Sequence, residues 1–336
     1  MRGRIAALVL GVSAALPFAV SPISGSAAAT QSWLPQSSLA MLVRGDRSLR
    51  RRAVAGATEF LTCQTQADAC TVYDSSGNVL YALSSADGLL SPEGISVGSV
   101  TGTWAIANSN GGNILLYSLT QSGPVQIGTI DDAGEMPMDV KISEIGTKKG
   151  LQSQSFLISN YYDASRESGY AIYVDPSGNQ TILDPPEGYR GLGGGVAFDA
   201  KNKDCFWSMT IFPQQYDAES FLIRYKGCRN PGKAYEQGGD ASGVVIDKKG
   251  NLYGTFLEDG LLYKCAKLGR GECSNFTYSG LDPYFMALSA DDSTLFAPDM
   301  AGTVVGCSTS TLKCETEFSV SGYTPAGIAV LPAAPP

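Results

Sequence analysis

The feature that most restricts the fold of this chain is an internal repeat. Six times along the sequence a short apolar strand begins, usually beside a glycine, and in the complete copies a turn and a strand rich in aromatic and β-branched residues follow. The first strands of the copies begin near Gly94, Asp139, Gly195, Gly243, Met286 and Gly327. The period of roughly 40 to 56 residues is typical of the blades of a β-propeller.

Each complete copy contains four strands, named A to D in chain order. In the fourth copy they are VVI, LYGTF, LLYKC and CSNFTY, separated by the turn sequences DKKGN, LEDG and AKLGRGE. The last copy supplies only strand A (326–332), whereas the first strands of the chain, ATEFLTC, CTVYD and NVLYALS, lack a strand A. We therefore predict an all-β fold, a six-bladed β-propeller with four-stranded blades, whose ring is closed when the C-terminal strand joins the N-terminal strands. A β-sandwich would explain the short strands but not six similar units.

Three strand A sequences carry a resemblance to known families. PEGISV, GVVIDKKGNLYGT and AGIAVLP resemble the strand A signatures of NHL-repeat propellers and of the related gluconolactonase-like propellers. The resemblance covers nearly all of residues 58–332 and implies the same six-bladed fold. It implies much less about activity, because many functions occur on this scaffold.

The N-terminal residues 1–29 have the pattern of a cleaved secretory signal. Arg2 and Arg4 precede an apolar run that ends in the small residues SGSAAA. A membrane anchor is the alternative, but Pro17 and Pro22 interrupt a run that is already short for a bilayer span. We expect a secreted or periplasmic protein with no transmembrane segment in the mature chain.

The rest of the chain divides into three parts. Residues 30–57 are predicted to be a flexible basic segment, and its RGDRSLRRR (44–52) suits a tether or processing segment better than an integrin or nucleic-acid motif. Residues 58–332 form the predicted propeller, and residues 333–336 are a tail.

The composition excludes several kinds of chemistry. The chain contains no histidine, which excludes Ser/His/Asp and Cys/His triads and every His-ligated metal site. Without residues 1–29, 22 basic side chains face 32 acidic ones. Nucleic acid is therefore not an expected partner, because its phosphates require a basic surface.

The eight cysteines are predicted to form disulfides between neighbouring antiparallel strands. In an exported chain, pairs close in sequence suit opposed strands, whose residues lie about 5 Å apart. A zinc site would need paired C-x₂-C spacings, and the sequence has none. The predicted pairs are Cys63–Cys70, Cys205–Cys228, Cys265–Cys273 and Cys307–Cys314.

The loops between strands B and C and between strands D and A are expected on one face, around the central channel. Three of the predicted disulfides lie at the opposite face, which leaves this one freer to recognise a ligand. Carboxylates interleaved with tyrosines suit a cationic group, calcium or a sugar, although such loops also serve merely to keep an acidic protein soluble. The candidate binding residues in these loops are Asn108, Tyr161, Tyr162, Asp163, Tyr216, Glu258 and Asp299.

The gluconolactonase-like resemblance implies a divalent cation at the channel mouth, which polarises a lactone carbonyl. Glu93 matches the glutamate that precedes the first strand A in that family. The aspartate expected in the fourth copy is replaced by Ser242, with Asp240 two residues earlier. Glu93, Asp139 and Asp240, with Asn108, therefore form a degenerate candidate site for Ca²⁺ or another divalent cation. The other copies offer no oxygen-bearing side chain at this position, where they have Met138, Gly194, Phe285 and Ala326.

Two functions follow from these patterns. The first is a non-catalytic binding module that takes a small-molecule, carbohydrate or protein ligand at the channel mouth. The alternative is a metal-dependent lactonase or related hydrolase, for which Glu93, Asp139 and Asp240 should converge within about 5 Å so that they can share one cation.

Overall fold

The computed structural model describes residues 58–331 with gaps. The gaps are residues 121, 132, 147–151, 200, 202, 212–218, 237–240, 257–259, 268–272, 277–283, 300–301 and 321–324. Among the residues described, no helix is long and apolar enough to cross a bilayer.

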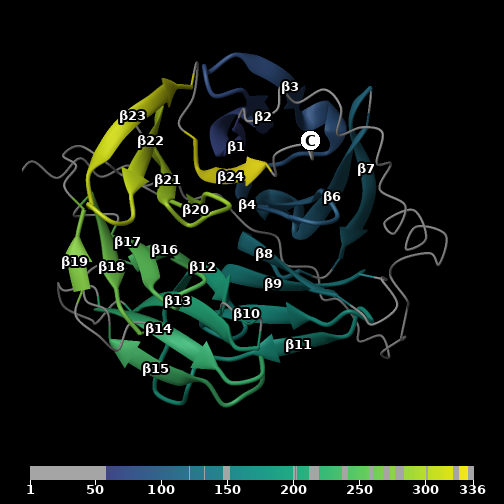
Figure 1. Ribbon diagram of the computed structural model, residues 1–336. Helices are drawn as coiled ribbons and strands as arrows, with labels where there is room; N and C mark the ends of the chain where they lie inside the picture. Colours follow the sequence, from purple (N-terminus) through teal and green to yellow (C-terminus); the bar gives the residue numbers. More distant parts are fainter. Residues whose placement is uncertain are drawn as a thin grey trace, which may run out of the picture. The chain divides into compact units, whose positions relative to one another are not determined.

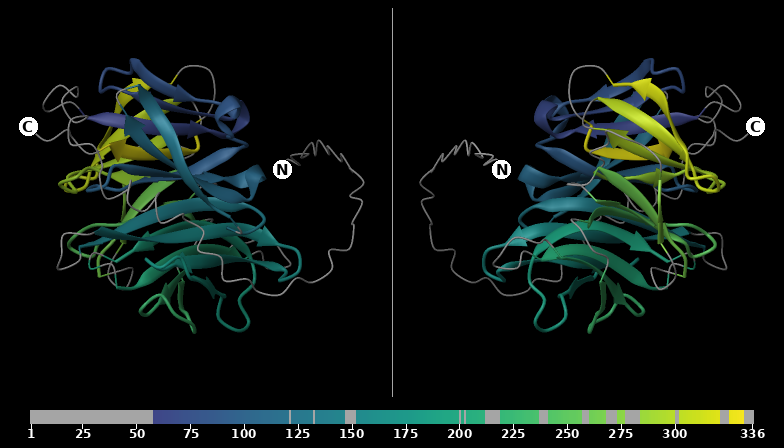
Figure 2. Two further views of the ribbon diagram at one scale, coloured as in Figure 1. Left: turned by 90° about the vertical axis from the view of Figure 1, so that its right-hand side faces the viewer. Right: turned by 90° about the vertical axis from the view of Figure 1, so that its left-hand side faces the viewer.

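The described residues form six antiparallel four-stranded sheets around a common centre (Figure 1), which confirms the predicted six-bladed propeller. The side views show loops gathered at two opposite faces of these sheets (Figure 2). Blade 1 contains β4 (Pro92–Val97), β5 (Thr103–Asn108), β6 (Asn113–Thr120) and β7 (Gly123–Ile130). Blade 2 contains β8 (Pro137–Gly146), β9 (Gln152–Asp163), β10 (Ser168–Val174) and β11 (Gln180–Leu183). Blade 3 contains β12 (Leu192–Phe198), β13 (Cys205–Ile211), β14 (Glu219–Tyr225) and β15 (Lys233–Glu236).

The remaining blades follow the same pattern, with strand A innermost. Blade 4 contains β16 (Ala241–Ile246), β17 (Leu252–Phe256), β18 (Leu261–Cys265) and β19 (Cys273–Asn275). Blade 5 contains β20 (Ala287–Leu288), β21 (Thr294–Asp299), β22 (Thr303–Ser308) and β23 (Cys314–Ser319). Blade 6 contains β24 (Gly327–Leu331), β1 (Glu59–Gln64), β2 (Ala69–Tyr73) and β3 (Val79–Leu83), in that order across the sheet. Three short 3₁₀ helices lie in loops: η2 (Thr65–Ala67), η3 (Ser85–Asp87) and η4 (Ser109–Gly111).

The hydrophobic core lies between blades rather than in one central mass. Six clusters of buried apolar residues each join two adjacent blades. Successive side chains of a strand point to opposite faces of its sheet. Trp104 and Ile106 of β5 therefore pack against blade 6, whereas Ala105 and Ala107 pack against blade 2. This is why the strands of the repeat have apolar residues at consecutive positions.

All four predicted disulfides are present. Three join residues directly opposed in an antiparallel pair, with Cα atoms 4.0, 4.1 and 3.9 Å apart: Cys63–Cys70, Cys265–Cys273 and Cys307–Cys314. In the fourth, Cys205 begins β13 while its partner Cys228 lies three residues beyond β14, at a Cα distance of 4.9 Å. Only Cys63–Cys70 lies at a turn between strands B and C.

Candidate functional site

The candidate site begins at the ends of the innermost strands, where strand A of blades 1 to 4 carries an irregularity in its pairing with strand B. The register shifts between Pro92 and Ile95, Pro137 and Asp139, Gly193 and Val196, and Ala241 and Val244. Such bulges bend a strand and redirect its side chains, and they are common beside functional sites. The residues within these four irregularities include Glu93, Met138, Gly194 and Ser242.

Glycines beside these bulges allow neighbouring innermost strands to touch. A Cβ atom on Gly94 would overlap the Asp139 carboxylate, and one on Gly327 would overlap the carbonyl oxygen of Glu93. A Cβ on Gly243 would likewise meet the carbonyl oxygen of Tyr284. The glycine at the start of the repeat is therefore required by close approach between blades.

Asp139 fills the place of this glycine in blade 2, and its carboxylate is engaged within the propeller. Its Oδ1 accepts hydrogen bonds from the backbone N–H of Val140 (2.9 Å) and from Lys141 Nζ (2.8 Å). Its Oδ2 accepts from the N–H of Val196 in blade 3 (3.0 Å). Burial raises the pKa of Asp139, although Lys141 and the two N–H groups oppose this rise. The side chain therefore links two blades and neutralises a lysine.

Glu93 has a different environment. It lies in the bulge of β4, is partly buried, and has no hydrogen-bond or ion-pair partner among the described residues. Burial raises its pKa to about 7. The other bulged positions that were named above contribute no charge.

The predicted metal set is not assembled within the described part of the chain. No group of three acidic, cysteine or histidine side chains there is placed to hold an ion. Asp139 is occupied by Lys141, and Asp240 lies outside the described residues, as do Tyr216 and Glu258. The cation site therefore stays a prediction.

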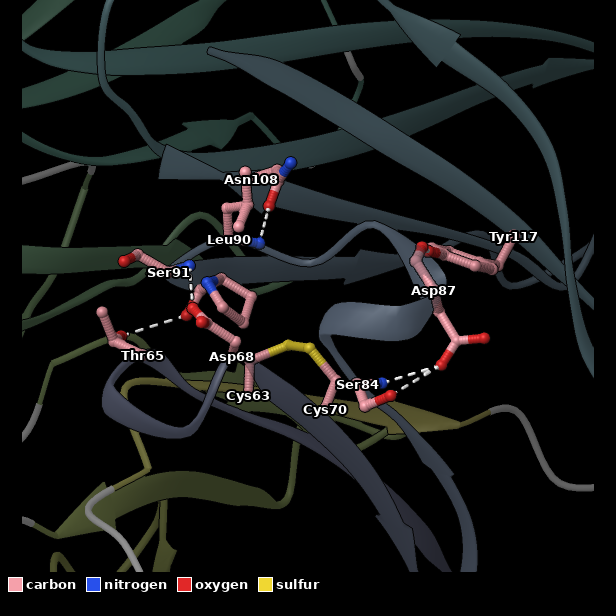
Figure 3. The surroundings of a disulfide bond; sticks show 11 residues. Cys63, Thr65, Asp68, Cys70, Ser84, Asp87, Leu90, Ser91, Asn108 and Tyr117 are labelled. Carbon is pink, nitrogen blue, oxygen red and sulfur yellow. Dashed lines mark hydrogen bonds between the residues drawn. A yellow bond between two sulfur atoms is a disulfide. The ribbon is translucent and has the colours of Figure 1, made fainter. Parts of the chain in front are cut away.

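Asn108 holds the loop between β3 and β4 in place (Figure 3). It is buried at the end of β5, and its Oδ1 accepts a hydrogen bond from the N–H of Leu90 (2.6 Å). Its Nδ2 donates to the carbonyl of Gly88 (3.2 Å) and to Asn113 Oδ1 (2.9 Å). Both side-chain polar atoms of Asn108 are engaged within the propeller, with the loop between β3 and β4 and with Asn113 of β6, so neither is directed to a ligand.

The turn stapled by Cys63–Cys70 holds the other side of the same loop (Figure 3). Asp68 Oδ1 accepts from the N–H of Ser91 (2.6 Å), and Thr65 Oγ1 donates to the carbonyl of Pro92 (3.0 Å). Blade 6 thereby fixes the strand A entry of blade 1, immediately before Glu93.

Two further predicted acids also stabilise turns. Asp163 Oδ1 accepts from Ser165 Oγ (2.6 Å) and its Oδ2 pairs with Arg166 Nε (3.2 Å). Burial acts to raise the pKa of Asp163, but the hydrogen bonds from Ser165 and Arg166 outweigh burial and lower the pKa. Asp299 is buried, and its Oδ2 accepts from Thr303 Oγ1 (3.3 Å) in the turn between β21 and β22.

Three large apolar side chains are exposed on this face, beside exposed polar residues such as Asn110, Asp131 and Glu135. The exposed fractions of Leu90, Met136 and Tyr162 are 48%, 37% and 38%. The N–H of Tyr161 donates to the carbonyl of Met136 (2.9 Å), and the N–H of Asn110 donates to that of Leu90 (3.2 Å). We call Leu90, Met136 and Tyr162 the loop surface. Tyr162 was among the predicted residues, whereas Leu90 and Met136 were missed. Both of the missed residues are large apolar residues in loops of mainly small and polar residues.

Comparisons with known proteins find likeness of fold only. No family model and no curated protein matches the chain. A chain in the crystal structure of a nidogen/laminin complex superposes with a TM-score of 0.59 at 11% identity, over 82% of this chain and 99% of that one. A functionally unknown protein from Desulfotomaculum acetoxidans DSM 771 gives a TM-score of 0.54 at 12% identity, over 82% and 99%. The narrower assignment to NHL-repeat or gluconolactonase-like propellers stays a prediction.

Proposed function

We propose that this protein is an exported β-propeller that binds a partner through its loop surface without catalysing a reaction. The observation that carries the proposal is the exposure of Leu90 and Met136 on two loops and of Tyr162 at the end of β9, where backbone hydrogen bonds hold the chain at Leu90 and Met136. Single exposed apolar residues are ordinary, but three on hydrogen-bonded backbone of one face offer contact area at little loss of conformational entropy on binding.

The charges beside these residues define the partner further. Asp131 and Glu135 are exposed in the loop that also contains Met136, and no base lies in the described part of that loop. A partner that combines apolar with basic groups suits this surface, as in a peptide segment of another protein. The nidogen/laminin structure is an example of this fold in a complex of two proteins.

The same geometry does not favour the lactonase alternative. Metal-assisted hydrolysis needs carboxylates free to bind the cation. Among the described candidate carboxylates, Asp139, Asp163 and Asp299 instead accept hydrogen bonds within the propeller, and Glu93 alone has no such partner among the described residues. Export is supported by the leader-like residues 1–29 and by four disulfides, which persist in oxidising compartments.

The test uses a photo-crosslinking amino acid at position 162 and, as the matched control, at Val100. Val100 is 46% exposed but lies in the turn between β4 and β5, on the opposite face. We expect a discrete crosslinked species from position 162 alone when the exported protein is irradiated in its native medium. Met136→Asp should then weaken binding of the partner so identified at least tenfold, while Val100→Asp leaves it unchanged. Equal crosslinking from both positions would contradict the proposal.

A further inference from the structure

The face of the propeller opposite the loop surface carries the turns between strands A and B and between strands C and D, because successive strands run antiparallel. In blades 3 and 4 the described parts of these turns lie within residues 199–204, 226–232, 247–251 and 266–267. Every exposed charged side chain among these described residues is basic. We define the basic surface as these seven side chains: Lys201, Lys203, Lys226, Arg229, Lys248, Lys249 and Lys267.

The three acids in the same turns are buried or half-buried, and the turns themselves engage them. Asp199 and Asp247 each accept two backbone N–H hydrogen bonds within their own turn. Asp204 forms an ion pair with Arg224 of β14, which does not belong to the basic surface. Seven bases against three acids leave an excess of four positive charges here, in a chain whose net charge is −8. The acidic balance of the whole chain therefore conceals a basic region.

The turns of blades 3 and 4 lie close enough for their charges to act together. Phe206 at the start of β13 belongs to the same buried cluster as Leu252 and Cys265, which flank the turns of blade 4. Within a blade, two strand spacings of about 5 Å each separate one turn from the other. The Debye length is about 10 Å at an ionic strength of about 0.1 M. An anionic group at the basic surface therefore interacts with several bases at once.

The lysines of blade 4 are not required by the turn that carries them. Residues 247–251 (DKKGN) form the same turn as residues 74–78 (DSSGN) of blade 6, with the aspartate accepting from two backbone N–H groups and from the asparagine amide. Exposed serines occupy positions 75 and 76, where blade 4 has Lys248 and Lys249. Lys248 also lies 3.9 Å from an acid of blade 5. The two positive charges therefore need an explanation other than the local fold, and an anionic partner supplies one.

We propose that the basic surface binds an acidic polysaccharide, whose sulfate or carboxylate groups recur along an extended chain. Six of its seven bases are lysines, which act as point charges, whereas the bidentate recognition of phosphate favours arginine. The described residues of these turns contain no aromatic side chain on which a nucleic-acid base could stack. None of the large exposed apolar side chains lies in them, as insertion into a lipid surface would require. The site lies opposite the loop surface, so it does not depend on the function proposed above.

Titration with heparin, a sulfated polysaccharide, at low ionic strength tests the proposal. Lys248→Ser/Lys249→Ser gives blade 4 the serines that blade 6 has in the same turn, and it should weaken heparin binding about tenfold. The matched control is Ser75→Glu/Ser76→Glu, which lowers the net charge by the same amount at the same turn positions of blade 6. We expect this control to bind heparin as the wild type does. Lys201→Ser/Lys203→Ser in blade 3 should weaken binding as the blade 4 variant does, because both blades contribute to one surface.

Three results would overturn the proposal. The first is that the wild type does not bind heparin at low ionic strength. The second is equal weakening by Lys248→Ser/Lys249→Ser and by Ser75→Glu/Ser76→Glu, which would show that only the net charge matters. The third is tighter binding to phosphatidylglycerol vesicles or to a DNA duplex than to heparin, at an equal concentration of anionic groups, because it would identify another class of partner.

Discussion

Replacing Asp139 with asparagine tests whether this residue holds the propeller together or belongs to a metal site. The carboxylate is fully buried and accepts three hydrogen bonds, from Val140, Lys141 and Val196. Asparagine has one acceptor oxygen, so at least one buried N–H loses its partner, at a cost of about 1–3 kcal/mol. Lys141, whose side chain is 16% exposed, also loses its counter-charge. Together these losses should lower the free energy of unfolding by about 3–5 kcal/mol.

Denaturant titration of purified wild type and Asp139→Asn measures this difference directly. For a domain of this size the same loss lowers the melting temperature by roughly 10 °C. Asp87→Asn is the control, since Asp87 is an exposed acid in a helix-capping interaction, and its substitution should change the free energy of unfolding by about 1 kcal/mol or less. The double variant Asp139→Asn/Lys141→Met should recover about 1–2 kcal/mol relative to the sum of the single substitutions, because each single variant leaves one charge unpaired and the double variant leaves none.

Two results would refute this reasoning. A free energy of unfolding within about 0.5 kcal/mol of wild type would show that the hydrogen bonds of Asp139 contribute no more than an ordinary surface residue does. A rise in the melting temperature of the wild type with Ca²⁺, absent from Asp139→Asn, would make the carboxylate a metal ligand, because a ligand that binds only the folded state stabilises it.

Three other substitutions test neighbouring features. Because burial raises the pKa of Glu93 from 4.5 to about 7, the folded state holds a proton that the unfolded state releases. The wild type should therefore lose roughly 3 kcal/mol relative to Glu93→Gln as pH rises from 4.5 to 7, measured by denaturant titration across that range, and parallel pH profiles would contradict this. Gly327→Ala should destabilise the fold by about 3 kcal/mol, because the new Cβ meets the backbone of Glu93. Its control is Gly102→Ala, where φ is 72° and no atom lies within 4 Å of a Cβ, so that the loss should be only about 1 kcal/mol. Equal losses in the two variants would show that strand contact is not the reason for Gly327. Replacing both Cys205 and Cys228 with alanine opens a loop whose ends are 23 residues apart and should lower the free energy of unfolding by about 3.4 kcal/mol. The same replacement of Cys63 and Cys70, which are seven residues apart, should lower it by about 2.5 kcal/mol. A larger fall in melting temperature for the Cys63–Cys70 variant would count against the loop-entropy account.

The fold was predictable from the sequence because every blade repeats one pattern. Apolar residues at consecutive positions of β5 serve two blade interfaces, and the glycine at the start of strand A in four of the six blades reports contact between strands. The disulfides were predictable because three of the four pairs are cross-strand neighbours close in sequence. These signals are local, and they recur from blade to blade around the ring.

The roles of the candidate site residues depend on contacts that sequence spacing does not reveal. Asp139 bonds to Val196, 57 residues away, and Asn108 holds Leu90 from 18 residues away. Sequence spacing therefore predicts that an acid or amide on this face is available to a ligand, whereas the structure uses it internally. Leu90 and Met136 were missed for the converse reason, since only the folded loops show that these apolar side chains remain exposed.

The residues proposed for recognition differ from those that stabilise this end of the propeller, and that separation can be measured. The bulge recurs in blades 1 to 4, but an acid occupies it only at Glu93, so the bulge itself belongs to the packing of the innermost strands. None of the three residues of the loop surface belongs to the buried clusters between blades. Substitutions at Asp139 or Gly327 should therefore reduce stability and binding together. Substitutions at Met136 or Tyr162 should change binding while the free energy of unfolding stays within about 0.5 kcal/mol of wild type, as expected for surface positions.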